Sequence, residues 1–433
     1  MSVGTLHANI ILNEPGRIHC GSHDPVQGHV SIRYTPGPRN VNAELFGPLN
    51  ISVNLHGRVK SKIWKSNGQS TSIYRGRAQL FLEDVGMNNL SFRAKPGETQ
   101  LFPFSISFPE NAHPLRDKHG KFLNQDTFDE DPRFNISPYQ PLPPSFQNSY
   151  HGFAHRYESF VEYRLGVEIG MPQLQVDVIK PIEDQEPIIH YERPRVTPST
   201  EGDQPTEWRG YISVRNELLL PEADRPSGFR QKTKALFGAG HFPTYSFDWI
   251  CSAPKHIHLG QPVCFEVKIM PREHECTATL VPDVRLKYFR MELTAYTQVR
   301  SKRVLLRCQG SEGKYTVCEM VGFIDSRDPF SKANDNTKLI NTDAIGSGRI
   351  GSFVASFTTF NISQTYILKI GFAFEVAGQV KHIDREYAIM VYPPLEMPIH
   401  SPATTAGPSS QPIGGENNGP DLPPYETAPS YKQ

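Results

Sequence analysis

Residues 161–169 read Val-Glu-Tyr-Arg-Leu-Gly-Val-Glu-Ile, and every second side chain from Val161 to Ile169 is large and apolar. Successive side chains of a strand point to opposite faces, so this alternation predicts a strand with one buried face. The same period of two recurs along both halves of the chain. It is present at Val30–Tyr34, Ile51–Leu55, Phe102–Phe108, Val263–Ile269 and Tyr366–Val376.

Helical periodicity is scarce by comparison. The two stretches that favour short helices are Glu217–Leu220 and Ser331–Leu339. Many short strands separated by Gly and Pro turns, with few helices, indicate packed sheets rather than an α/β fold. The predicted fold class is therefore all-β, with two immunoglobulin-type β-sandwiches in tandem.

One long strand is expected to contain an irregularity. Val284, Leu286 and Tyr288 alternate, and the apolar set from Phe289 to Ala295 then continues on the opposite parity. An extra residue in a strand restores a common buried face after such a slip. We therefore predict a β-bulge near Tyr288-Phe289.

The chain of 433 residues is too long for one ordinary core, which favours two domains and a tail. We place the first sandwich at 1–195, with an inserted polar loop at about 113–139, and the second at 207–394. A stretch rich in Pro, Thr and acidic residues, Pro194–Glu207, would separate them. Residues 395–433 hold eight prolines and four glycines and no alternating run, so we expect them to be disordered.

Composition excludes several classes of protein. Lys+Arg and Asp+Glu both number 45, which argues against nucleic acid as the main partner. No apolar run approaches the length of a membrane span, and the N-terminus does not read as a signal peptide. Six sparse cysteines without a CxxC spacing fit a reducing compartment. The four N-x-S sequons, at Asn50, Asn89, Asn135 and Asn361, are therefore interpreted as chance.

Two segments of the first half resemble the arrestin N-domain. Leu142-Pro143-Pro144-Ser145-Phe146, followed by the strand that opens at Val161, is similar to the turn and strand of its signature, and Phe102–Pro109 resembles the strand before them. The strands at Gly210–Val214 and Gly260–Ile269 extend a weaker resemblance over roughly residues 5–395. The resemblance implies an arrestin-like double sandwich that acts as a trafficking adaptor.

The end of the chain is similar to the α-arrestin branch, whose members carry Pro-rich L/P-P-x-Y motifs after the second domain. Here the motif is Leu422-Pro423-Pro424-Tyr425, and Ala428–Tyr431 is a degenerate copy that keeps Pro429 and Tyr431. The resemblance implies recruitment of a WW-domain HECT-type ubiquitin ligase to plasma-membrane transporters or receptors, which promotes their ubiquitination and endocytosis. It also implies a cytoplasmic protein, peripheral at the plasma membrane and endosomes. The long 113–139 loop and the single good motif depart from the common pattern.

The motif has a physical basis for this binding. Its prolines favour polyproline II, so docking into an aromatic-lined WW groove costs less ordering entropy. Leu422 and Pro423 would pack between aromatic rings, and Tyr425 would fill a second pocket with its hydroxyl at the rim. A flexible chain from Leu395 to Leu422 has a root-mean-square reach of about 30 Å. A tethered ligase would thus act at high effective concentration on nearby lysines.

A basic stretch in the second half supports two readings. It comprises Arg285, Lys287, Arg290, Arg300, Lys302, Arg303, Arg307 and Lys314. Arg300, Lys302, Arg303 and Arg307 would form a surface for acidic cargo tails or anionic lipid heads. The alternative is a solvated hairpin whose cations guard strand edges.

Catalytic chemistry is not expected. No P-loop, G-x-G-x-x-G, G-x-S-x-G or H-E-x-x-H motif occurs, and the acidic run Asp126–Asp131 reads as a solvated loop. Neither His256 and His258 nor His274-Glu275-Cys276 makes a convincing metal site, so we expect no cofactor and no metal. Two alternatives to the adaptor remain: a structural endosomal subunit with a retromer-like double sandwich and no ligase recruitment, and an enzyme or carbohydrate-binding sandwich.

Overall fold

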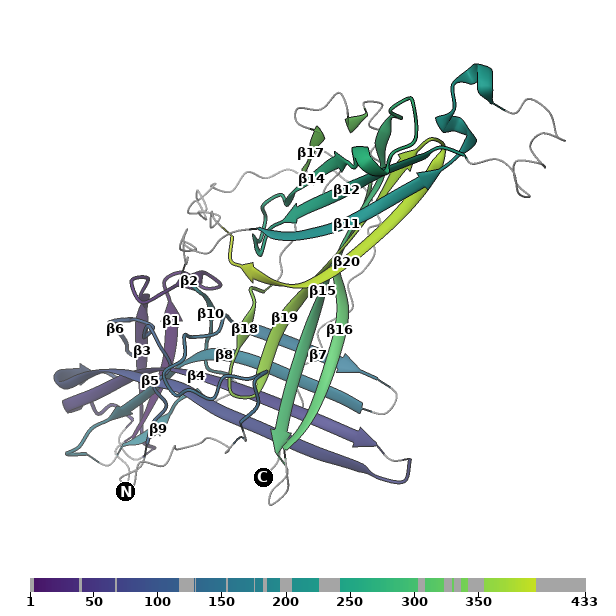
Figure 1. Ribbon diagram of the computed structural model, residues 1–433. Coiled ribbons are helices and arrows are strands. Elements are labelled where there is room, and N and C mark those ends of the chain that lie inside the picture. Colours follow the sequence, from purple (N-terminus) through teal and green to yellow (C-terminus); the bar gives the residue numbers. More distant parts are fainter. Residues whose placement is uncertain are drawn as a thin grey trace, which may run out of the picture. The chain divides into compact units, whose positions relative to one another are not determined.

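A computed structural model describes most of the chain before residue 395. The described residues are 4–38, 41–66, 68–116, 128, 130–152, 155–174, 176–181, 185–194, 205–225, 242–302, 308–322, 329–330, 336–341 and 354–394; for 155, 302 and 308–322 the description covers the backbone. The strands lie in one compact unit, Met1–Leu395. The predicted all-β class is confirmed, because sheets account for nearly all the regular structure (Figure 1).

Three sheets organise the described residues. The first, in spatial order, is β6 (Thr99–Ile106), β3 (Val26–Pro36), β1 (Gly4–Leu12) and β9 (Asp177–Ile179). The third is β11 (Thr206–Arg215), β12 (Thr244–Ala253), β14 (Cys264–Pro271) and β17 (Thr337–Asn341).

The second sheet has 12 strands and runs through both halves of the chain. Its path is β13 (His256–His258), β20 (Gln379–Tyr392), β19 (Ile362–Val376), β15 (Val284–Lys302), β5 (Thr71–Ala94), β4 (Leu45–Ser66), β8 (His155–Gly170), β10 (Ile188–Glu192) and β2 (Ile18–Cys20). Beside this path, β16 (Cys308–Gly322) pairs with β15, β18 (Phe357–Thr358) with β19, and β7 (Phe146–His151) with β8. The two halves of this sheet meet where Lys302 of β15 pairs with Arg75 of β5.

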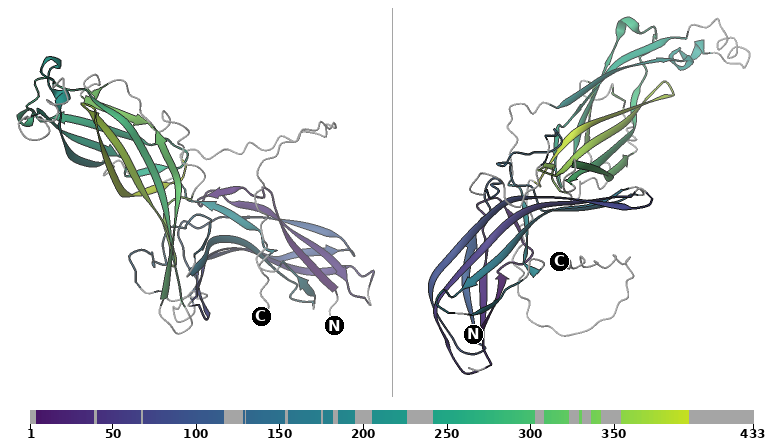
Figure 2. Two further views of the ribbon diagram at one scale, coloured as in Figure 1. Left: turned by 90° about the vertical axis from the view of Figure 1, so that its right-hand side faces the viewer. Right: turned by 90° about the horizontal axis from the view of Figure 1, so that it is seen from below.

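Two hydrophobic cores fill the spaces that these sheets enclose. The first joins side chains such as Val30 of β3 to Leu55 of β4 and Tyr163 of β8. The second joins Trp249 of β12 and Val267 of β14 to Phe372 of β19. Side chains from two sheets form each core. Figure 2 shows the three sheets from two further directions.

The turn that carries the family resemblance is tied to the first core. The Tyr163 hydroxyl donates a hydrogen bond to the carbonyl of Pro143 at 2.5 Å, and the Tyr191 amide donates to Ser145 Oγ at 2.9 Å. Tyr163 itself is fully buried, and burial raises the pKa of its phenol well above the usual value. The alternating strand and the Pro-rich turn are thus parts of one packed unit.

The predicted bulge is present. The register between β15 and β19 shifts between Leu286 and Tyr288. Leu286 before the shift and Phe289 after it are both buried, whereas Tyr288 is only half-buried. The extra residue therefore keeps both parities of the sequence on the core face.

Of the two predicted helices, one corresponds to a short 3₁₀ helix and the other ends in a strand. Glu217–Leu219 is a 3₁₀ helix, capped by the Asn216 side chain, which accepts from the Leu218 amide. Two further 3₁₀ turns, Glu222–Asp224 and Glu273–Glu275, are as short. The helix expected at Ser331–Leu339 is wrong over its described end, because Thr337–Asn341 is strand β17, paired with β14. Its two β-branched residues, Thr337 and Ile340, and the pairing with β14 outweigh the local helical pattern.

Candidate functional site

The predicted ligase-binding residues lie outside the described residues. This holds for Leu422, Pro423, Pro424 and Tyr425, and for Pro429 and Tyr431 of the degenerate copy. Arg303 and Arg307 of the predicted basic patch also lie outside. Lys302 ends β15, where its backbone pairs with Arg75 of β5.

Arg300 is placed clearly, and the surface role predicted for it is wrong. The side chain is 4% exposed. Its Nε donates to the carbonyl of Phe360 at 2.7 Å, and its guanidinium carbon lies 4.5 Å from the ring centre of Phe134 and 4.8 Å from that of Phe128. A guanidinium held between two aromatic rings is a packing element rather than a contact for cargo.

Arg300 belongs to a polar junction made by Ser61, Arg300, Ser301 and Asn361. Ser61 Oγ donates to the Arg300 carbonyl at 2.7 Å and lies 2.9 Å from Ser301 Oγ. Asn361 Nδ2 donates to Ser61 Oγ at 2.8 Å, and Asn361 is fully buried. Glycan attachment needs that nitrogen to be exposed, so the reading of this sequon as chance agrees with the fold.

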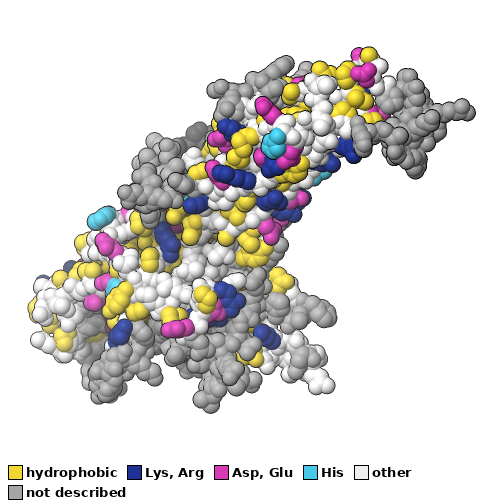
Figure 3. Space-filling model, viewed as in Figure 1, with side chains coloured by type: hydrophobic (Ala, Val, Ile, Leu, Met, Phe, Trp, Pro, Cys, Tyr) yellow, Lys and Arg dark blue, Asp and Glu magenta, His cyan; other side chains and the backbone are white. Residues whose placement is uncertain are grey.

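Other described cations of the basic stretch are held by carboxylates. Arg285 pairs with Asp283 at 3.1 Å, Lys287 with Glu375 at 3.1 Å, and Arg290 with Glu292 at 3.0 Å. Figure 3 shows basic and acidic side chains interspersed on this view of the molecule. The described part of the stretch is therefore closer to the solvated-hairpin reading than to a single-sign patch.

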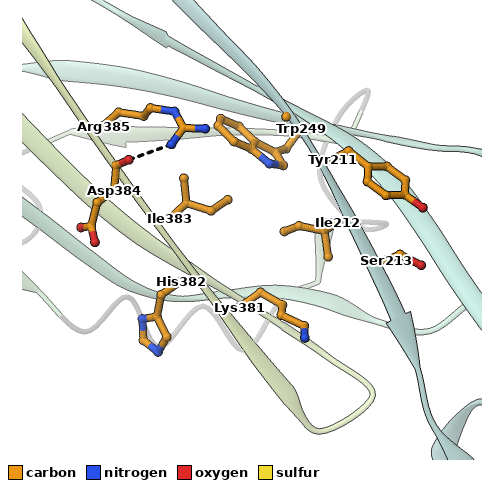
Figure 4. Close-up of a pocket in the computed structure, with 10 residues that line it drawn as sticks. Tyr211, Ile212, Ser213, Trp249, Lys381, His382, Ile383, Asp384 and Arg385 are labelled. Atoms are coloured by element: carbon orange, nitrogen blue, oxygen red, sulfur yellow. Dashed lines mark hydrogen bonds between the residues drawn. The ribbon is translucent and has the colours of Figure 1, made fainter.

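The second core carries a groove of about 420 Å³ between β11 and β20. Ile212 and Ile383 lie between the two strands, with Arg385 beside Trp249 (Figure 4). The other lining residues are Gly210, Tyr211, Ser213, Lys381, His382 and Asp384.

Gly210 of β11 and Trp249 of β12 lie opposite each other and pack together where they line the groove. The Trp249 indole is 2% exposed and lies over Gly210, where an added Cβ would come within 2.4 Å of its Cζ2. The Arg385 guanidinium carbon is 5.4 Å from the Trp249 ring centre. Gly210 therefore makes room for the indole, and the indole supports a cation at the rim.

An arginine outside β11 packs on Tyr211 of that strand. The Arg272 guanidinium carbon lies 4.6 Å from the Tyr211 ring centre. The same guanidinium binds Asp248 at 2.9 Å and Glu275 at 2.8 Å, and its hydrogen bond lowers the pKa of Glu275. Tyr211, which is 47% exposed, is thus held as a rigid aromatic surface beside the groove.

Both strands that border the groove have an open edge among the described residues. β11 pairs with β12, and Gln379–Ala388 of β20 pairs with β19. An open edge offers backbone donors and acceptors to an added strand. The groove can therefore take an extended segment of another chain, with Lys381 and Arg385 available to acidic side chains.

Nucleophilic and metal chemistry have little support in the described residues. Burial raises the pKa of the Cys251 thiol to about 12, so it stays protonated. Within the described ranges no group of three or more His, Cys, Asp or Glu side chains is placed to hold a metal ion. His258 Nδ1 lies 3.1 Å from the Pro393 carbonyl, and His256 and His258 both pack on Tyr392.

Sequence reasoning missed the groove and the polar junction. Both depend on which strands become neighbours: Gly210 faces Trp249 through the β11–β12 register, and Ser61 meets Asn361 across 300 residues of sequence. No local motif marks such pairs. The glycine at 210, inside an otherwise regular strand, is the one available signal of a close approach.

Comparisons with known proteins add no family. No protein-family model matches the chain, and no curated protein matches it. Among the described residues, no helix is both long and apolar enough to span a bilayer.

Proposed function

We propose that this chain is a non-enzymatic, arrestin-like adaptor of two tandem β-sandwiches. In this proposal it recruits a WW-domain HECT-type ubiquitin ligase to plasma-membrane transporters or receptors and promotes their ubiquitination and endocytosis. The observation that carries the proposal is the Leu422–Tyr425 motif in a Pro-rich segment that follows the strands of two hydrophobic cores. The packed Leu142–Phe146 turn supports the arrestin-like assignment.

The two parts of the chain would have separate tasks. The Leu422–Tyr425 segment would dock in polyproline II form on the aromatic groove of a WW domain. The β-rich part would hold the cargo. The groove between β11 and β20 is suited to an extended cytosolic tail because, among the described residues, both of its strands have open edges. An adaptor of this kind needs no catalytic group of its own.

Binding of purified WW domains to the full chain tests the ligase half of the proposal. Tyr425→Ala should weaken binding at least tenfold, about 1.4 kcal/mol, because the motif loses its aromatic anchor. Tyr431→Ala is the matched control, since it removes a tyrosine from the degenerate copy, and it should bind within about twofold of wild type. Full retention of WW-domain binding by Tyr425→Ala would refute the proposal that this motif recruits the ligase.

Cargo delivery separates the adaptor from the retromer-like alternative. Truncation after Pro394 should abolish cargo ubiquitination in cells while leaving cargo association intact. A truncated chain that still supports normal cargo transport would instead favour a structural trafficking subunit.

A further inference from the structure

The groove between β11 and β20 is closed at both ends. At one end, Asn216 Nδ2, just after β11, donates to the carbonyl of Ala377 at 2.6 Å. At the other end, the ring of Trp208 on β11 packs edge-on against the ring of Tyr387 on β20, with 4.8 Å between the ring centres. The two strands belong to different sheets and approach each other at these two points, so the space between them has a defined length.

The alternation of β20 separates the groove from the outer face of the second sheet. The side chains of His382 and Asp384 point away from the groove (Figure 4). The ring centre of His382 lies 6.3 Å from that of Tyr288. The Asp384 carboxylate lies over Gly371 of β19, where an added Cβ would come within 2.7 Å of its Oδ1. The side chains on the groove side, each paired with a core residue of β19, are those of Lys381, Ile383 and Arg385.

Two cations stand at the ends of this row. Lys381 and Arg385 are four residues apart, so about 14 Å of strand separates them. The Arg385 guanidinium carbon lies 5.4 Å from the ring centre of the buried Trp249, which holds the cation at the groove. Within the described ranges, neither Lys381 nor Arg385 forms an ion pair with a carboxylate. The groove therefore presents two positive charges with Ile383 between them.

The middle of the groove is apolar. Ile383 of β20 and Ile212 of β11 lie across it from each other (Figure 4). Ile383 is half-buried, so part of its side chain still contacts water. An apolar side chain placed between the two isoleucines would remove that surface from water, which stabilises the bound state.

The edge of β20 that borders the groove is open over Gln379–Ala388. In the described part of the chain only β19 pairs with this stretch. A peptide strand added to an open edge gains main-chain hydrogen bonds, and its side chains lie beside those of the residues opposite. Peptide positions i, i+2 and i+4 would therefore lie beside Lys381, Ile383 and Arg385, in whichever direction the peptide runs.

We propose that this groove binds an extended peptide segment of a partner protein that carries a carboxylate, an apolar side chain and a second carboxylate at alternate positions. The segment adds to β20 as a strand. Its carboxylates form cross-strand pairs with Lys381 and Arg385, and its apolar side chain covers Ile383 and Ile212. This inference rests on the proposed function, in which the groove holds the cytosolic tail of a cargo protein, and it adds the sequence pattern that such a tail carries. The Leu422–Tyr425 motif takes no part in the binding.

Three heptapeptides with blocked termini test the pattern on the full chain by fluorescence anisotropy. The first, Ser-Glu-Thr-Val-Thr-Glu-Ser, has the proposed spacing. The second, Ser-Glu-Glu-Val-Thr-Thr-Ser, has the same composition with adjacent glutamates, and the third replaces both glutamates of the first by glutamine. The first should bind at least about fivefold more tightly than either of the others, and its affinity should fall as NaCl is raised from about 50 to about 500 mM. Equal affinity of the first two peptides would overturn the proposal, as would no binding to any of the three.

N-methylation of the first peptide tests the addition to β20. Successive amides of a strand point to opposite sides, so methylating both the valine and the threonine after it removes at least one main-chain donor that faces β20. The methylated peptide should bind at least about fivefold more weakly than its parent. Unchanged affinity would show that no strand is added and would contradict the proposal.

Charge variants locate the site. Lys381→Gln with Arg385→Gln should weaken the first peptide about tenfold and leave the affinity for the glutamine peptide within about twofold of wild type. The control, Arg33→Gln with Lys95→Gln, removes two exposed cations from the first half of the chain and should change the affinity by less than about twofold. Equal losses in the two double variants would contradict the proposal.

Stability and ligase binding are measured on the same proteins. Neither Lys381 nor Arg385 is fully buried, so the double variant should melt within about 3 °C of wild type. If it melts lower, Lys381→Gln alone takes its place with an expected loss of about threefold, and no loss there would count against the proposal. Tyr425→Ala should bind the first peptide as wild type does. Failure of the ligase assignment would therefore leave peptide binding unchanged, and failure of the peptide test would leave WW-domain binding unchanged.

Discussion

Replacement of Arg300 by alanine tests the polar junction most directly. The change removes the Nε donor to the Phe360 carbonyl and the guanidinium between Phe128 and Phe134. A buried carbonyl left without its donor costs about 1–3 kcal/mol, and each lost cation–π contact about 0.5–2 kcal/mol. Since these contributions overlap, we expect Arg300→Ala to lower the free energy of unfolding by about 3 kcal/mol.

Urea unfolding followed by tryptophan fluorescence measures the effect. Arg285→Ala is the matched control, because Arg285 is a 39% exposed member of the same strand that pairs with Asp283. It should change the unfolding free energy by no more than about 0.5 kcal/mol. Arg300→Lys should fall between the two, since lysine keeps the charge and loses the planar donor. A result for Arg300→Ala that matches the Arg285 control would refute the packing role.

Two other predictions concern pH and close packing. Burial, with Arg58 nearby, lowers the pKa of His56 to about 4, so the folded chain keeps it neutral while the unfolded chain protonates it below 6.5. The free energy of unfolding should therefore fall as pH drops from 6.5 towards 4, by roughly 2 kcal/mol at about pH 5. His56→Asn should flatten the dependence of unfolding free energy on pH over this range. Parallel pH curves for the wild type and the variant would contradict the prediction. Gly210→Ala should destabilise by about 1–3 kcal/mol and alter the near-ultraviolet circular dichroism of Trp249, because the new Cβ meets the indole at 2.4 Å. Gly170→Ala should leave stability nearly unchanged, because a Cβ added at Gly170 has no other atom within 4 Å beyond its chain neighbours. Equal effects of the two substitutions would refute the steric reasoning.

Alternation predicted the sheets because it reports one property, the burial of every second side chain. It located the strand at 161–169 and the bulge beside Tyr288 for the same reason. It failed at Arg300, where Val299 and Arg300 are consecutive and both buried. One face of β15 contributes Val299 to the first core, and the other is covered at this point by the aromatic pair Phe128 and Phe134. A strand covered on both faces loses the period-two signal, so its cations look like surface residues.

The cross-strand neighbours of β4 escaped sequence analysis for a different reason. Lys60 and Lys62 look ordinary in their own strand, since they alternate with apolar residues as solvent-facing side chains do. The β4–β5 register alone determines that they lie opposite Arg77 and Arg75. A shift by one residue would move these cations to the core face and abolish the arrangement.

The register of β4 also explains why the polar junction was not predicted. Ser61 points to Arg300 and Asn361, while its neighbours Lys60 and Lys62 lie on the other face of the strand. The buried polar side chains tie β4 to Arg300 near the end of β15 and to Asn361 immediately before β19. Because these residues are far apart in the sequence and meet only through the fold, no local pattern marks the contact.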